Sequence, residues 1–272
     1  MKISVITTAL NAAGTIRDCL ESVRRQTHPE VEHVVVDAGS ADGTLDILAE
    51  YQESLARVIS EPDRGIYDGM NKGLGLVTGE VVGILNADDM YCGPDVLAKV
   101  ARVFAEKRVE SCYGDLVYID GGAGGSRDPA SGRRSAAGGN RITRYWRSGE
   151  FRPERFYWGW MVPHPTFFVR REVYERCGGF NLELGTAADY EMMLRLLVRH
   201  RITTAYLPET LIMMRAGGAS NATLAGRVRA NAMDRKAWEV NGLRPYPWTL
   251  WLKPLRKVGQ WFHRQVGMSI KS

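Results

Sequence analysis

The sequence predicts an α/β protein in which a mainly parallel central sheet is covered by helices on both sides. Over the first 120 residues, β-branched apolar segments alternate with amphipathic segments, so that single helices separate the strands. Such crossovers are right-handed and connect parallel strands. The chain has 272 residues, 44% apolar and 25% charged, which suits a globular domain with a full core. Ligands of such sheets bind beyond the carboxyl ends of the strands, where we therefore expect the functional residues.

The opening segments justify the first elements in order. Ile3–Ala9 and Val31–Val36 are β-branched apolar runs, and Arg57–Ser60 is a shorter third strand. A helix between the first two strands is indicated by apolar residues at i, i+3, i+4 and i+7, namely Ile16, Cys19, Leu20 and Val23.

The next elements continue this alternation. A second helix is expected to begin near Thr44, with Ser40 or Asp42 as its cap. Pro94 marks the start of a later helix, because proline is favoured in the first turn. Between and after them the sequence predicts a helix and two strands, over Tyr67–Val77, Val81–Leu85 and Ser111–Ile119.

The pattern changes after residue 120. Residues 121–140 are rich in Gly, Ser, Ala and Arg and predict a loop, as a plain insertion rather than a lid. Beyond it, Thr166–Val169 is predicted to be a strand, Ala188–His200 a helix, and Ile202–Tyr206 a strand.

Composition excludes several classes of protein. The net charge is +5, but the cations form no basic, aromatic-interleaved motif, which argues against nucleic-acid binding. The four cysteines form no Cys-x-x-Cys pair and no zinc-type cluster, which suits a reducing cytosol. No apolar run of about 18 residues predicts a membrane span, and the first residues read as a strand rather than a signal peptide. A cytoplasmic location is therefore expected.

Two clusters carry charge at predicted strand and helix ends. Asn86-Ala87-Asp88-Asp89 directly follows a strand, and adjacent acids there repel each other unless a divalent cation such as Mg²⁺ or Mn²⁺ binds them. A capping and turn role is the alternative. In the segment from Asp63 to Gly73, glycines flank a helix start, and Arg64 or Lys72 would hold phosphate oxygens. A glycine-rich turn is the alternative there.

Two further positions carry chemistry in the second half. Asp189 begins a predicted helix and either caps it or acts as a general base. His164 precedes a predicted strand. Its role is open among three alternatives: a ligand, a donor to substrate and a structural side chain.

Together, these segments resemble family 2 glycosyltransferases of the GT-A fold, a Rossmann-like α/β fold. The resemblance covers residues 1–215 and rests on five segments in order: ISVITTALN, VVVDAGSADGT, SEPDRGIYDGMNKGLGLVTGEVVGILNADD, HPTFFVRREVYERCGGFN and AADYEMMLRL. It implies a catalytic domain whose residues 1–118 bind a nucleotide sugar and whose residues 141–215 bind the acceptor. Residues 216–272 would be a C-terminal helical extension.

The resemblance also implies roles for single residues. Asp189 would be the catalytic base. Asp88 would be the main metal ligand, with Asp89 and His164 as further candidates. The nucleotide sugar would be bound by Thr7, Thr8, Asn11, Asp37, Arg64, Asn71, Lys72, Asn86, Ala87 and Asp88, with Asp37 on the nucleobase and Arg64 near the diphosphate.

This sequence departs from the family pattern at two positions. Asn86 replaces the first acid of the usual Asp-x-Asp motif, and Ala188 replaces the Glu that often precedes the base. The Gln-x-x-Arg-Trp motif of processive members is absent after Asp189. The implied activity is therefore a hexosyltransferase type (EC 2.4) that moves one sugar from a nucleoside diphosphate sugar to a hydroxyl acceptor, with inversion and a divalent metal. The acceptor class implied is a lipid-linked or cell-envelope glycan.

Other functions were weighed against this one. A dinucleotide-dependent oxidoreductase would need Gly-x-Gly-x-x-Gly after the first strand, and a sugar nucleotidyltransferase a glycine-rich basic loop there, and both are missing. An inactive nucleotide-sugar binding protein is the third alternative, although the retained Asp88 and Asp189 argue against it.

The tail from Tyr246 to Ser272 predicts an amphipathic helix. Its apolar residues share one helical face and its cations lie largely elsewhere. Trp248, Trp251 and Trp261 would suit a membrane interface, so one reading is a helix lying on an anionic surface at the inner face of the plasma membrane. The equal alternative is packing on the catalytic domain or a second subunit, as a homo-oligomer.

Overall fold

The computed structural model describes residues 1–120, 141–215 and 224–253. These residues form one sheet of nine strands in the order β3-β2-β1-β4-β8-β6-β9-β5, with β7 paired to β6. The strands are β1 (Ile3–Ala9), β2 (Val31–Asp37), β3 (Arg57–Ser60), β4 (Val81–Ile84), β5 (Met90–Tyr91), β6 (Ser111–Asp120), β7 (Arg141–Trp146), β8 (Phe168–Arg170) and β9 (Thr204–Arg215).

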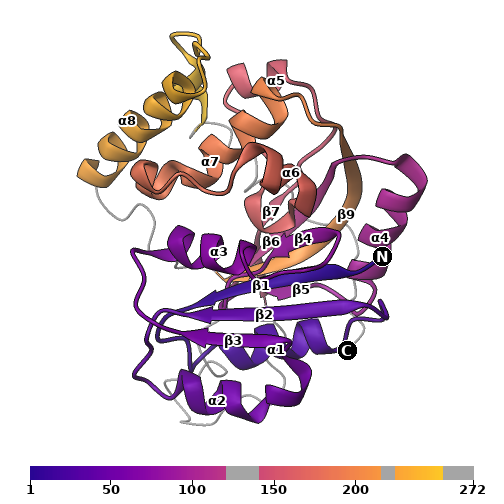
Figure 1. Cartoon of the computed structure of the whole chain (residues 1–272). Coiled ribbons are helices and arrows are strands. Elements are labelled where there is room, and N and C mark those ends of the chain that lie inside the picture. The colour runs from indigo at the N-terminus through magenta and orange to yellow at the C-terminus, as the bar shows by residue number, and fades with distance from the viewer. Residues whose placement is uncertain (121–140, 216–223, 254–272) are drawn as a thin grey trace.

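Helices cover both faces of this sheet. Figure 1 shows α1 and α2 below the strands and α3, α6 and α7 above them. The helices are α1 (Ile16–Arg24), α2 (Thr44–Glu50), α3 (Ile66–Leu74), α4 (Val96–Lys107), α5 (Glu154–Tyr157), α6 (Arg171–Cys177), α7 (Ala188–Met193) and α8 (Leu224–Val240). The predicted α/β class is confirmed.

The direction of the strands changes along the sheet. Strands β1 to β4 pair in parallel, as predicted from the alternation of strands and helices. Beyond β4, the short β8 lies antiparallel to both β4 and β6, and β6 pairs in parallel with β9. Strands β7 and β5 add antiparallel pairs to β6 and β9. The first half of the sheet is thus parallel, and the second half is mixed.

Local sequence explains the elements that were predicted well. All four apolar residues of the i, i+3, i+4, i+7 pattern in α1 are buried. Helix α2 begins at Thr44, as predicted, but its N-cap is Gly43 rather than Ser40 or Asp42, in a left-handed conformation with φ +93°. Asp42 precedes the cap and accepts from the Thr44 N–H at 3.1 Å. Helix α4 begins at Val96, two residues after Pro94.

The segment after His164 differs from the prediction of a strand at 166–169. His164–Thr166 form a 3₁₀ turn, and the strand begins only at Phe168. Pro165 has no N–H to donate to a neighbouring strand. The Thr166 hydroxyl donates instead to the carbonyls of Pro163 at 2.9 Å and Gly114 at 3.0 Å, a local bonding pattern that competes with strand pairing.

Strand β9 is longer than predicted. It runs to Arg215, past Pro208, and its register against β6 shifts between Tyr113 and Leu116. Gly114 permits this irregular pairing: a Cβ there would lie 2.6 Å from Leu211 Cγ and 2.8 Å from the Glu209 carbonyl. The predicted helix from Ala188 is present, with Leu194–Arg199 continuing α7 as a π-helical segment.

Helix α8 belongs to the same core as the sheet. Trp238 is fully buried in a cluster that also holds Ile6, Met70 and Tyr190, and its indole N–H donates to the Tyr190 hydroxyl at 3.0 Å. The division into a domain at 1–215 and an extension at 216–272 stays a prediction. The predicted loop 121–140, the segment 216–223 and the tail helix beyond residue 253 lie outside the described residues. In the ranges that are described, no helix has the length and apolar character needed to cross a membrane.

Candidate donor and acceptor site

Asp37 organises the loop that follows β2. Its carboxylate is fully buried and accepts hydrogen bonds from the backbone N–H groups of Gly39 at 3.0 Å and Ser40 at 2.9 Å, and from the hydroxyls of Ser40 and Ser60. Burial raises the pKa of Asp37, but the Ser40 and Ser60 hydrogen bonds outweigh it and hold the pKa below its usual value. A nucleobase would reach this carboxylate only if the Ser40 side chain moved.

Strand β1 presents its two threonines to opposite faces of the sheet. The Thr7 hydroxyl lies in the interior against His33 Nε2 at 2.9 Å and Cys19 Sγ at 3.7 Å. Thr8 faces α3, and its buried hydroxyl has no hydrogen-bond partner. Asn11 follows in a left-handed conformation with φ +48° and joins the loops after β1 and β2, accepting from the Ala41 N–H at 3.0 Å.

The acidic motif extends β4 at the same edge. The Ala87 N–H donates to the Thr8 carbonyl at 3.3 Å, and the Asn86 amide donates to Asp89 Oδ2 at 3.3 Å. Asp89 is fully buried, and its pKa is raised well above its usual value, first by burial and then by the charge of Asp88. Asp88 is partly exposed, and its carbonyl accepts from Arg215 Nε at 3.1 Å.

These residues fit a divalent cation through their unused oxygens. Asn86 Oδ1, Asp89 Oδ1 and Thr8 Oγ1 are buried without hydrogen-bond partners, and such oxygens are the ligands that Mg²⁺ and Mn²⁺ take. A cation beside Asp88 and Asp89 would also relieve their repulsion. Within the described residues, no group of three or more His, Cys, Asp or Glu side chains forms a metal site by itself. Any cation bound here would therefore need oxygens from the donor or water.

The predicted phosphate-side residues lie on α3 or just before it, in three different settings. The Arg64 side chain is 77% exposed and pairs with Asp68 at 3.2 Å, so its guanidinium can reach a ligand. Lys72 is paired with Glu61 at 2.8 Å and donates to the Pro62 carbonyl. Asn71 points to the second half of the chain, where its amide bonds to the backbone of Phe180. Arg64 is thus far more exposed than Lys72, and the role of all three in donor binding stays a prediction.

Asp189 lies in a second group of polar residues. It begins α7, and its Oδ1 accepts from the Tyr190 N–H at 2.7 Å. Tyr67 of α3 interacts with Asp189, and burial together with this carboxylate raises the pKa of Tyr67. His164 is also close enough to sense the Asp189 charge, while burial lowers the pKa of its ring. The charge of Asp189 therefore acts on both Tyr67 and His164, and the role of His164 as a metal ligand stays a prediction.

Helix α3 connects the two groups. A Cβ on Gly69 would lie 3.1 Å from both Thr8 Cγ2 and Asp63 Oδ2, so this glycine lets α3 approach the end of β1. Thr8 in turn pairs with Ala87 of the acidic motif. Two residues before Gly69, Tyr67 contacts Asp189. The acidic motif and Asp189 therefore lie at the two ends of one continuous set of contacts across α3.

Three residues of this region had no role in the sequence analysis. Tyr67 and Phe180 stand only within longer quoted segments, and Arg215 is only the last residue of the predicted catalytic domain. Arg215 is 8% exposed and bonds to the Asp88 carbonyl and to Asp18 of α1. The only sequence signal for Arg215 is that clustered acids need a cationic partner. A single sequence does not show which of its distant Lys or Arg residues is that partner.

Comparisons with known proteins agree with this geometry. The model of glycosyl transferase family 2 matches residues 4–178. The PGL/p-HBAD biosynthesis glycosyltransferase of Mycobacterium tuberculosis is 30% identical over 223 residues, covering 80% of this chain and 78% of that protein. Among solved structures, S. aureus TarS 1–349 has a TM-score of 0.68 at 20% identity, with 97% of this chain and 73% of that one covered. The chain spans 39% of a longer TarS chain.

Two solved structures contain donors. TarS 1–349 has been solved in complex with UDP-GlcNAc. The mannosyltransferase PcManGT from Pyrobaculum calidifontis, solved with GDP-Man and Mn²⁺, has a TM-score of 0.60 at 21% identity and covers 93% of this chain and 72% of its own. A fold of this kind, with acids after β4, defines a GT-A glycosyltransferase. The chain belongs to glycosyl transferase family 2, because the family model matches most of its length and a curated relative is 30% identical over 80% of it.

Proposed function

We propose that the enzyme transfers a single sugar from a nucleoside diphosphate sugar to a hydroxyl of a glycan or lipid-linked acceptor, with inversion at the anomeric carbon. The observation that carries this proposal is the continuous set of contacts across α3, which joins the acidic motif near Asp88 to Asp189. The donors bound by TarS and PcManGT, and the biosynthetic role in the name of the mycobacterial relative, support it.

The chemistry follows from the two groups. Asp189 accepts the proton of the acceptor hydroxyl as its oxygen attacks the anomeric carbon, and the bond to the diphosphate breaks on the opposite side. A divalent cation held by Asp88, with Asp89 beside it, would neutralise charge on the departing diphosphate. Arg64 would supply a further positive charge at the start of α3. The loops around Thr8, Asn11 and Asp37 would bind the nucleoside.

A thermal-shift panel tests the donor. We expect one of UDP-GlcNAc, GDP-mannose and a dTDP-sugar to raise the melting temperature by several degrees, and more strongly with Mn²⁺ than with EDTA, because binding to the native state alone stabilises it. Free sugars at the same concentration are the control. A panel in which no nucleotide sugar shifts the melting temperature more than its free sugar would contradict the proposal.

We further propose that the enzyme works at an anionic membrane surface on the cytoplasmic side. Trp158, Tyr246, Trp248 and Trp251 are 45–71% exposed, and the rings of Trp158 and Trp248 lie 5.9 Å apart. Aromatic side chains of this kind favour the membrane interface. The sequence beyond residue 253 adds the cations Arg256, Lys257, Arg264 and Lys271. A second copy of the chain is the alternative occupant of this surface.

Liposome co-sedimentation separates these two occupants. We expect the full chain to sediment with vesicles of anionic lipid, and less so at high salt, because exposed charges are screened. A chain that ends at Lys253 keeps the ion pair to Asp234 at 2.7 Å and should fold, yet sediment much less. Zwitterionic vesicles are the control. Failure of the full chain to sediment with anionic vesicles above the zwitterionic control, or a dimer in light scattering whose loss accompanies truncation, would contradict membrane binding.

A further inference from the structure

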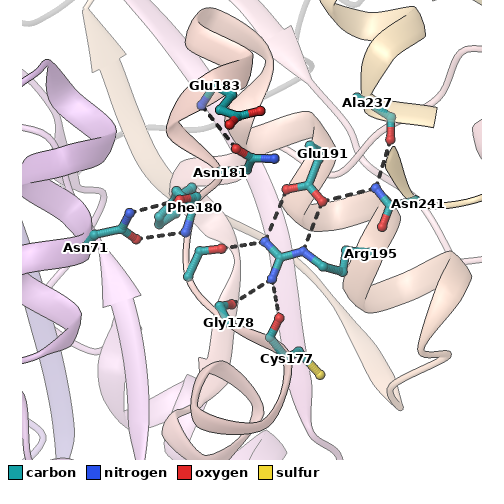
Figure 2. Close-up of polar contacts among 11 residues, drawn as sticks. Asn71, Cys177, Gly178, Phe180, Asn181, Glu183, Glu191, Arg195, Ala237 and Asn241 are labelled. Carbon is teal, nitrogen blue, oxygen red and sulfur yellow. Dashed lines mark hydrogen bonds and ion pairs between the residues drawn. The ribbon is translucent and has the colours of Figure 1, made fainter. Parts of the chain in front are cut away.

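The carboxylate of Asp189 sits on the same helix as a buried ion pair. Figure 2 shows Arg195 bonded to Glu191, one helical turn earlier, through Nε at 3.0 Å and Nη2 at 3.1 Å. The two side chains are only 12% and 4% exposed. Replacing a buried ion pair by apolar residues often leaves stability unchanged or raises it, so stability alone is a weak reason for this pair.

Arg195 also holds the turn that follows α6. Its Nη1 donates to the carbonyls of Cys177 and Gly178, the latter at 2.8 Å, and its Nη2 donates to the carbonyl of Gly179. Gly178 has φ +86°, a conformation that favours glycine. One guanidinium thus fixes three successive carbonyls, which a single ammonium group cannot do in the same geometry.

The fixed turn docks onto α3 in the first half of the chain. Phe180 N–H donates to Asn71 Oδ1 at 2.8 Å, and Asn71 Nδ2 donates to the Phe180 carbonyl at 2.9 Å, as Figure 2 shows. Gly179 lies so close to the Asn71 side chain that a Cβ on Gly179 would lie 2.4 Å from Asn71 Oδ1. Both ends of the Asn71 amide are therefore used by one residue, 109 positions further along the chain.

The ring of Phe180 then reaches the surroundings of Asp189. It lies 5.4 Å from the ring of Tyr67 and 5.5 Å, edge-on, from that of His164. These are the two side chains that interact with Asp189 from outside its own helix. Behind Glu191, Asn241 follows the end of α8 and donates to Glu191 Oε1 at 3.1 Å and to the carbonyl of Ala237 in α8 at 2.8 Å, which ties the pair to α8.

We propose that Glu191 and Arg195 are positioning residues for the Asp189 carboxylate, acting through the turn 177–180 and its contact with Asn71. This inference rests on the proposed role of Asp189 as base. It assigns Asn71 to the alignment of the two halves rather than to donor binding. The network touches neither the acidic motif nor the loop of Asp37, so its loss should spare donor binding and slow the transfer step.

The test compares Arg195→Lys with Arg199→Lys in the full chain. Arg199 is an exposed arginine of the same helical segment and serves as the matched control. UDP and GDP binding is measured calorimetrically, and the rate is the release of UDP or GDP from UDP-GlcNAc or GDP-mannose with Mn²⁺ and octyl glycosides as acceptors. We expect Arg195→Lys to keep the stoichiometry and Kd of the nucleotide within twofold, while kcat per binding site falls at least tenfold.

Three outcomes would overturn the positioning role. The first is a kcat equal to that of Arg199→Lys. The second is a stoichiometry of nucleotide binding that falls by the same factor as the rate of nucleotide release. Such a result indicates that the variant loses folded protein, and hence a merely structural role. The third is an equal further loss when Arg195→Lys is combined with Asp189→Asn, since a residue that acts only through Asp189 has no effect once the carboxylate is gone. If Arg195→Lys leaves kcat unchanged while Asp189→Asn is inactive, this inference is refuted and the proposed function remains intact.

Asn71→Asp serves if Arg195→Lys does not fold. A carboxylate still accepts from the Phe180 N–H but cannot donate to its carbonyl. We expect kcat per binding site to fall while the nucleotide Kd stays unchanged. A weaker nucleotide Kd with kcat unchanged would instead make Asn71 a donor contact and overturn its positioning role.

Discussion

Asp189→Asn is expected to lower the transfer rate by about two to four orders of magnitude, the usual contribution of a general base. The amide keeps the size of the side chain and can still accept from the Tyr190 N–H, which Asp189 Oδ1 accepts at 2.7 Å. It cannot take a proton from the acceptor hydroxyl. Since the charge of Asp189 acts on Tyr67 and His164 and its Oδ1 is bonded to the Tyr190 N–H, binding of UDP or GDP by the loops after β1 and β2 should be unchanged.

The measurement is release of the nucleoside diphosphate with an acceptor present, beside calorimetric binding of the nucleotide. Asp46→Asn is the matched control, because Asp46 is an exposed acid in the first turn of α2, on the other face of the sheet. We expect the control to keep the parental rate. Transfer by Asp189→Asn at the rate of Asp46→Asn would remove Asp189 from the role of base.

The first half of the fold was predictable because its signals are local. The buried faces of α1 and α4 and the strands β1, β2 and β4 follow from apolar spacing within each segment. Asp88 and Asp89 follow β4 directly, so a parallel sheet places them at its ligand edge without any tertiary information. This is why the position of the acidic motif, after the end of β4, could be predicted from the sequence, whereas its role stays a prediction.

Residues paired across the chain could not be predicted in this way. Nothing in the sequence near Asn71 indicates Phe180 as its partner, and the pairing arises only when the turn after α6 docks on α3. The length of β9 depends on Gly114 in another strand, which accommodates Leu211. Similarly, Trp238 has the pattern of any apolar helix residue, and its place beside Tyr190 is set by tertiary packing.

Asp88→Asn is expected to abolish the response to Mn²⁺ and to slow transfer by about a hundredfold or more. A bound divalent cation contributes several kcal/mol to displacement of a phosphate group, and about 1.4 kcal/mol corresponds to a factor of ten. Asp88 is the partly exposed acid of the motif, and its neighbours Asn86 and Asp89 each have one buried oxygen, Oδ1, without a hydrogen-bond partner. The extra thermal shift that Mn²⁺ gives with the nucleotide sugar should disappear in this variant.

Stability distinguishes this loss from misfolding. The charge of Asp88 is one cause of the raised pKa of buried Asp89, so removing that charge also removes a like-charge repulsion. The metal-free melting temperature of Asp88→Asn should therefore equal or exceed that of the parent, although the variant is inactive. A variant that keeps the full Mn²⁺ increment would show that the cation binds elsewhere. A metal-free melting temperature below that of the parent would show that Asp88 stabilises the loop itself. Loss of a bound cation could not be the cause, because no cation is present in that measurement.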